Sequence, residues 1–165
     1  MASEYDIREA IVARMESALS VFSPAPIVIP RDITGILESG SFNGLLDEDQ
    51  KIHVWVVTPR SNLPVDKRQG GTLYELVYTL TQIIQYRSGT DLSNADRDAS
   101  LERDAVTNAF KWAGELPDIL KHAKTQPVEW QTDKIDKPYP IMNGTARQSQ
   151  AILRANNFYG PTTCS

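Results

Sequence analysis

Apolar side chains near the start of the chain recur every three or four residues, which is the spacing of one helix face. Those positions are Ile7, Ala10, Ile11, Met15, Ala18, Leu19 and Phe22. Ser3 and Asp6 resemble a capping box at the start of this segment, and Pro24 disfavours helical backbone just before it. The pattern predicts an amphipathic helix of about five turns, followed by a brief edge strand at 27–29.

Two later segments have the composition of strands. Residues 51–58 are β-branched and aromatic, with Ile52, Val54 and Val56 on one face and Pro59 at the end. Residues 72–86 alternate at period two, although part of this segment also fits a helix. Their content of Tyr, Thr and Ile favours a long strand that forms an antiparallel hairpin with 51–58.

The segments around these strands are rich in turn-forming residues. Residues 31–50 contain three glycines and predict a long loop, which in a compact domain is either functional or a missed element. Residues 59–71, PRSNLPVDKRQGG, predict a second loop. After Tyr86, the polar residues predict a turn that continues to Asp98.

Beyond this turn, the apolar spacing predicts a second helix that ends or bends at Gly114 and Pro117, with Asp96 and Asp98 at its N-terminus. Its apolar positions are Leu101, Ala105, Val106, Ala109, Phe110, Ala113 and Leu116. A short helical turn at 117–124, a strand at 128–131, irregular backbone at 133–144 and a terminal strand at 146–159 complete the prediction. For the last segment a helix is the alternative.

These elements predict an α/β protein of the α+β type, in which an antiparallel or mixed β-sheet is flanked by two main helices. Its 165 residues are near the usual size of one domain, so residues 1–165 are expected to form a single domain. Apolar residues make up 41% and charged residues 23%, the balance of an ordinary globular protein.

The net charge of −4 leaves no basic excess to neutralise nucleic-acid phosphates or to hold the chain on an anionic membrane. The longest run of large apolar residues, Val54 to Val57, is far too short to span a bilayer. The acidic N-terminus does not resemble a signal peptide. We therefore expect no membrane partner, and residence in the cytoplasm or in a particle assembled there.

Candidate catalytic and metal-binding residues are few. His53 and His122 are not in a metal-ligand spacing, and Cys164 has no second cysteine to pair with. Residues 91–102 have the length of a calcium loop, but Ala95 and Asp96 stand where a ligand and a glycine are required. The sequence therefore predicts no catalytic, cofactor-binding or metal-binding residues, and no cofactor.

Two charged clusters are candidate interface residues. Asp47, Glu48 and Asp49 close the first predicted loop, and Arg60, Lys67 and Arg68 make the second loop the most basic exposed segment. Adjacent acidic residues on a loop are usually solvated surface. Three basic residues in an acidic protein favour a protein partner or solvent over phosphate.

The order of these elements resembles the tail terminator proteins of long-tailed bacteriophages. The resemblance covers residues 5–113. It begins with an N-terminal helix, a short strand and loop, a strand around a tryptophan (KIHVWVV) and a flexible loop. It continues with a long strand (GGTLYELVYTLTQIIQY), a polar turn (RSGTDLSNADRDASLE) and a helix (RDAVTNAF). Residues 132–147 depart most from the family pattern.

The resemblance implies a structural virion protein that is not an enzyme and acts in the neck of the virion after assembly in the host cytoplasm. It implies a homo-hexameric ring that caps the tail tube, stops tube polymerisation and joins the tail to the head connector or stopper protein. Sheath protein is a further partner in a contractile tail. Genomic DNA would pass through the channel without sequence-specific binding. Both charged clusters would then be ring or tube interfaces, because loops on a rigid scaffold carry function.

Two alternatives remain open from the sequence. One is a head-completion or stopper protein of the same neck. The other is a small hydrolase or ligand-binding domain, which a pocket around His53 or His122 would favour.

Overall fold

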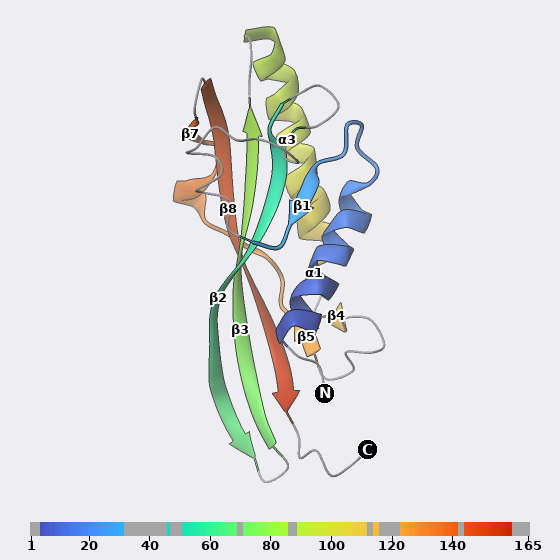
Figure 1. The fold of residues 1–165 in the computed structure, drawn as a ribbon, viewed down its shortest axis with the longest axis vertical. Coiled ribbons are helices and arrows are strands. Elements are labelled where there is room, and N and C mark those ends of the chain that lie inside the picture. The colour runs from blue at the N-terminus through green and yellow to red at the C-terminus, as the bar shows by residue number, and fades with distance from the viewer. Residues whose placement is uncertain are drawn as a thin grey trace.

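The described part of the chain forms one mixed β-sheet with two α-helices (Figure 1). The computed structural model describes residues 4–31, 46, 51–68, 71–85, 89–111, 114–115, 123–141 and 144–159. Their elements in chain order are α1 (Glu4–Leu19), β1 (Ile27–Ile29), β2 (His53–Arg68), β3 (Gly71–Gln85), α3 (Gly89–Ala109), β4 (Gly114–Glu115), β5 (Ala123–Thr125), β6 (Glu129–Trp130), the 3-10 turn η2 (Thr132–Lys134), β7 (Lys137–Ile141) and β8 (Gly144–Tyr159).

The sheet is built around its three longest strands. Its order is β1-β2-β3-β8-β5-β4, and β6 and β7 pair with β8 on the same side as β5. Only the β1–β2 pair is parallel among the described pairs. The sheet is therefore mixed, and the predicted α+β class is confirmed, as are the N-terminal helix, the 27–29 edge strand, the antiparallel hairpin and the terminal strand.

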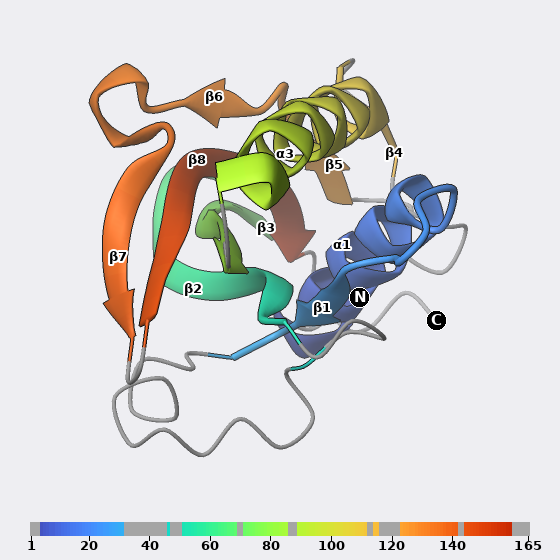
Figure 2. The same ribbon diagram turned by 90° about the horizontal axis from the view of Figure 1, so that it is seen from above.

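The main hydrophobic core lies between the helices and one face of this sheet. Figure 2 shows both helices on the same side, with the sheet curving around them. From α1, Ile7, Ile11, Met15 and Leu19 are almost completely buried, as the helical spacing predicted. The sheet and the end of α3 contribute Trp55, Val57, Leu76, Tyr78, Leu80, Val106, Phe110, Ala151, Leu153 and Ala155.

A second, smaller cluster lies on the opposite face of the sheet. It contains Ile29, Ile52, Val54, Val56, Ile83 and Ala146. The alternation of strand side chains explains why the four residues Val54–Val57 are all buried, since Val54 and Val56 point to one face and Trp55 and Val57 to the other. The prediction that Ile52, Val54 and Val56 share a face is confirmed.

The prediction of a loop at 59–71 is wrong, because β2 continues to Arg68 and pairs with β3 almost to its end. The two prolines that suggested a loop are accommodated because β1 pairs with β2 only as far as Val56, which leaves the outer edge of β2 without a described partner from there on. Proline is tolerated on such an edge. The register shifts between Pro59 and Ser61 and between Pro64 and Asp66 are the bulges that prolines often accompany.

The boundaries of the second helix were also predicted incorrectly. α3 begins at Gly89, so Asp96, Asp98 and the segment 91–102 are helical and do not form a polar turn. The apolar periodicity begins late because the first turns of α3 are polar. The helix ends at Ala109, and Gly114–Glu115 is the short strand β4.

The C-terminal half contains more strand than the sequence predicted. Ala123 and Lys124 belong to β5 and not to a helical turn, and the segment predicted as irregular contains most of η2 and the strand β7. Pro138 and Pro140 made this segment read as irregular, because proline cannot donate a backbone hydrogen bond. In the structure, both prolines lie in β7 and pair with residues of β8. The predicted strand at 128–131 is confirmed as β6. Within the 31–50 segment, the described residues are Arg31 and Leu46, and Leu46 makes an isolated bridge with Ile52.

Candidate functional site

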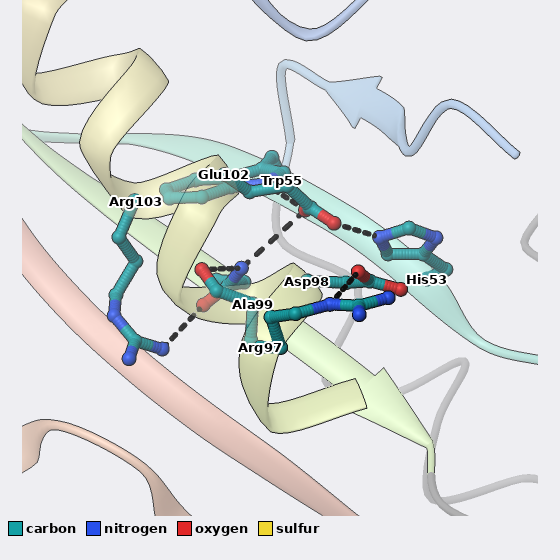
Figure 3. A network of polar contacts seen from close by, with 8 residues as sticks. His53, Trp55, Arg97, Asp98, Ala99, Glu102 and Arg103 are labelled. Carbon is teal, nitrogen blue, oxygen red and sulfur yellow. Dashed lines mark hydrogen bonds and ion pairs between the residues drawn. The ribbon is translucent and has the colours of Figure 1, made fainter. Parts of the chain in front are cut away.

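A buried carboxylate, Glu102, is the centre of a polar network between α3 and the sheet (Figure 3). Glu102 has no exposed surface, and burying a carboxylate costs several kcal/mol unless it is paired and hydrogen-bonded. Glu102 follows Ala99 and precedes Val106 on the buried face of α3, so helical spacing directs its side chain at the sheet.

Two residues of β2 contact this carboxylate. The His53 Nε2 atom lies 2.6 Å from Glu102 Oε2, and Trp55 Nε1 donates a hydrogen bond of 3.0 Å to Oε1. His53 and Trp55 are two residues apart, so both point to the helix-covered face of the sheet. His53 therefore lies on the opposite face of β2 from Ile52, and 7% of its surface is exposed.

The network continues across the sheet through Gln82 of β3. Its Nε2 donates to the Ala99 carbonyl at 3.1 Å and, at a longer 3.4 Å, to Glu102 Oε1. Its Oε1 accepts a hydrogen bond of 3.1 Å from Arg103, which also reaches Ser149 Oγ of β8 at 3.4 Å. The network therefore ties α3 to all three long strands at the level where the helix crosses them.

A second set of contacts extends this attachment to the C-terminal strands. Ser149 Oγ accepts a hydrogen bond of 2.9 Å from the Asp136 backbone N–H, just before β7. The Trp130 Nε1 of β6 donates to Thr107 Oγ1 of α3 at 2.8 Å, and its ring packs edge-on against Trp55 with centroids 6.1 Å apart. Aromatic pairs in this geometry add about 0.5–1.5 kcal/mol beyond area burial.

The hydrogen bonds of this network hold α3 on the sheet. One carboxylate and one imidazole are engaged with each other, and the remaining groups are a tryptophan N–H, an amide and a guanidinium that hold them in place. No group of three or more metal-ligating side chains occurs among the residues that the structure describes. The sequence alone did not identify Glu102, because the residues before it predicted a turn; its place one helical turn from Ala99 and Val106 was the available signal.

The other candidate site is the hairpin arm, which we define as Pro59–Arg68 of β2 with Gly71–Tyr78 of β3. Leu76 is the last core residue towards its tip, and Gly71–Glu75 are half-buried. Five residues of strand extend about 17 Å, and Figure 1 shows the arm, together with the end of β8, continuing past the end of α1. Gly71, at φ 146°, has the positive φ that the turn into β3 requires.

The structure places three of the six predicted interface residues on this arm. Arg60 is exposed near its base, and Lys67 and Arg68 form the last two rungs of the β2–β3 ladder, opposite Thr72 and Gly71. They are thus arranged on one strand, and not on a loop as predicted. The other three, Asp47, Glu48 and Asp49, lie outside the described residues, as does His122.

Comparisons with known proteins identify the fold and not the function. No family model matches the chain, and no curated protein matches it. A solved structure, whose name carries no functional description, is similar over 98% of this chain and 99% of its own, with a TM-score of 0.56 and 14% sequence identity. At this identity the likeness shows a shared α+β fold alone. No helix in the described part of the chain is long and apolar enough to cross a membrane.

Proposed function

We propose that the chain is a structural virion protein, the tail terminator of a long-tailed bacteriophage. As a ring it would cap the tail tube, stop tube polymerisation and present its other surface to the head connector. The order of elements supports this proposal. The N-terminal helix, the short strand, the tryptophan-containing strand, the long strand and the second helix occur as α1, β1, β2, β3 and α3.

The observation that carries the proposal is the hairpin arm. It projects from a helix-covered sheet, it contains Arg60, Lys67 and Arg68, and β2 pairs with β3 as far as Arg68, with two register shifts along the way. A protein whose work is to contact neighbouring subunits or rings needs a surface that reaches beyond its own core and keeps its shape there. A paired strand ladder provides such rigidity, because its backbone hydrogen bonds are already made.

The buried network would support this role. A terminator ring transmits contacts from the tube on one side to the connector on the other, so its helices and sheet should move as one body. Glu102 fixes α3 to β2, and Arg103 with Gln82 fixes it to β3 and β8. The net charge of −4 would limit adhesion of the passing DNA phosphates to the ring.

Labelled protein mixed separately with tail tubes and with DNA-filled, tailless heads tests the proposal. The terminator function predicts labels at one end of each tube, seen by electron microscopy, and no label on heads that lack a tail. Labels at the head vertex and none on tubes would contradict it and favour the head-completion or stopper protein. The matched control is a surface variant away from the arm, K134E/K137E, in which both altered residues are exposed.

A further inference from the structure

Few of the groups that contact the buried carboxylate of Glu102 can balance its charge. In the described part of the chain, its oxygens lie within hydrogen-bond distance of the His53, Trp55 and Gln82 side chains. The tryptophan N–H and the glutamine amide are neutral donors that do not titrate. Of these three residues, His53 is the one that can gain a proton and become a cation.

Other charged groups of α3 lie near this pair but are bound elsewhere. Arg103 donates to Gln82 Oε1 at 3.1 Å, so the amide of Gln82 lies between the guanidinium and Glu102. Asp98, one helical turn before Glu102, is exposed and lies 3.5 Å from the exposed Arg97 (Figure 3). The charges of such an exposed pair are screened by water and salt. None of these groups replaces a partner that lies 2.6 Å from the carboxylate.

The charged groups of the other elements are farther from the pair. Arg147 of β8 lies two strands from His53, and its Nη1 donates to the Asp136 carbonyl on the side away from β3. Two strands span about 10 Å, and Coulomb energy falls with distance. Arg14 of α1 lies over an aromatic ring two turns farther along α3. The charge of Glu102 is therefore balanced at close range by His53.

One positive charge opposes protonation of His53. Lys51 is half-buried and precedes His53 by two residues, which is about 7 Å along a strand. A like charge disfavours a second one nearby. The carboxylate of Glu102 lies 2.6 Å from the ring and acts in the opposite direction. The closer charge has the larger effect, so the balance favours the protonated ring.

The net charge of the buried pair depends on the state of the imidazole. An ionised Glu102 beside a neutral imidazole leaves a charge of −1 in a site where Glu102 is fully buried and His53 is 7% exposed. An imidazolium makes the pair neutral as a whole, and a buried charge is tolerated when it is paired. The N–H groups of Trp55 and Gln82 donate to Oε1 and favour the ionised carboxylate. The 2.6 Å contact is at the short end for hydrogen bonds between charged groups.

We propose that His53 and Glu102 form a pH-dependent contact between β2 and α3, in which the folded chain keeps His53 protonated at neutral pH. Folding then takes up a proton, because a histidine in an unfolded chain loses its proton at about pH 6.5. Below this pH both states carry the proton, and the contact contributes its full stability. Above it, the stability of the fold falls as the pH rises, until His53 in the folded chain is deprotonated as well. This behaviour belongs to the helix–sheet interface and does not depend on the proposed tail-terminator function.

Urea unfolding of the full chain at pH 6, 7, 8 and 9, at one protein concentration, measures this proton uptake. For wild type, the equilibrium constant of unfolding is expected to rise about tenfold from pH 7 to pH 8 relative to that of H53Q, because unfolding releases one proton. H53Q keeps a side-chain N–H that can donate to Glu102 but does not titrate. The matched control is H122Q, which removes the other histidine and should keep the pH dependence of wild type.

Nuclear magnetic resonance of the folded protein detects the proton itself and does not require a His53 variant to fold. In untagged H122Q labelled with nitrogen-15 histidine, all imidazole signals come from His53. Both ring nitrogens should carry a proton at pH 7.5, where a free histidine is about one-tenth protonated. The E102Q/H122Q protein, which has a neutral amide beside the ring, should lose the second proton at this pH.

Three results would overturn the proposal. The first is a His53 ring with one unprotonated nitrogen at pH 7.5 in folded H122Q. The second is the same dependence of unfolding on pH in wild type and H53Q. The third is a pH dependence that disappears in H122Q and persists in H53Q, which would assign the proton to the other histidine.

Discussion

Removal of the Glu102 side chain should be among the most destabilising substitutions outside the hydrophobic core. In E102A, the Trp55 Nε1 donor loses its 3.0 Å partner and His53 Nε2 loses its 2.6 Å partner, both in the buried interface between α3 and the sheet. Removing one member of a buried, hydrogen-bonded pair costs about 3–5 kcal/mol, because the groups left behind were desolvated for a partner that is gone.

Two further variants separate the contribution of the polar network from that of helix composition. E102Q keeps the side-chain volume and an oxygen that can accept from Trp55, so its cost should be smaller, about 1–3 kcal/mol. D104A removes an exposed carboxylate two residues away on the same helix and should stay within about 0.5 kcal/mol of wild type. The expected order of unfolding free energies is wild type and D104A, then E102Q, then E102A.

Urea unfolding at pH 7, followed by circular dichroism and tryptophan fluorescence, measures these free energies. All variants should be compared at one protein concentration, since self-association adds to apparent stability. For a chain of this length the cost in E102A corresponds to a fall in melting temperature of roughly 6–20 °C. If the unfolding free energy of E102A is less than about 1 kcal/mol below that of D104A, the reasoning is refuted. Removing a buried acceptor leaves its donors without a partner, which costs more than this.

Three other substitutions test separate parts of the fold by the same urea assay. W55F keeps an aromatic ring but removes both the donor to Glu102 and part of the buried indole, so it should cost at least about 1–3 kcal/mol; a neutral result would contradict this hydrogen bond. F110A empties a fully buried site in the main core and should cost about 3–5 kcal/mol; a loss below 1 kcal/mol would contradict the core assignment. R154A breaks half-exposed ion pairs with Glu75 and Glu129 and should cost less than about 1 kcal/mol, because solvent screens these charges. A loss above about 2 kcal/mol would show that solvent does not screen them.

The sequence predicted the elements whose side chains obey a clear period. α1 and the centre of the β2–β3 hairpin were predictable because Ile7, Ile11 and Met15 follow the helix period and Val54–Val57 combine β-branched and aromatic residues. The pairing of β8 with β3 was not predicted, since strand order depends on contacts between segments that are far apart in sequence.

Proline and polar residues hid the remaining elements. Pro59 and Pro64 suggested a loop, but the edge of a sheet does not require the N–H groups that they lack. The first turns of α3 are too polar to show a periodicity, so Glu102 was placed beside a loop and its burial was missed. A buried carboxylate has no signature of its own in a sequence; only the helix register around Ala99 and Val106 could have indicated it.

The proposal that the chain terminates tail tubes is tested most directly by the length of the tubes. Purified tube protein of the same phage would be polymerised with increasing amounts of the chain, and the tube lengths measured by electron microscopy. If the chain is a terminator, tubes become shorter as the chain is added, and capped tubes stop growing when fresh tube protein is supplied. Tubes of unchanged length that continue to grow in the presence of excess chain would contradict the proposal.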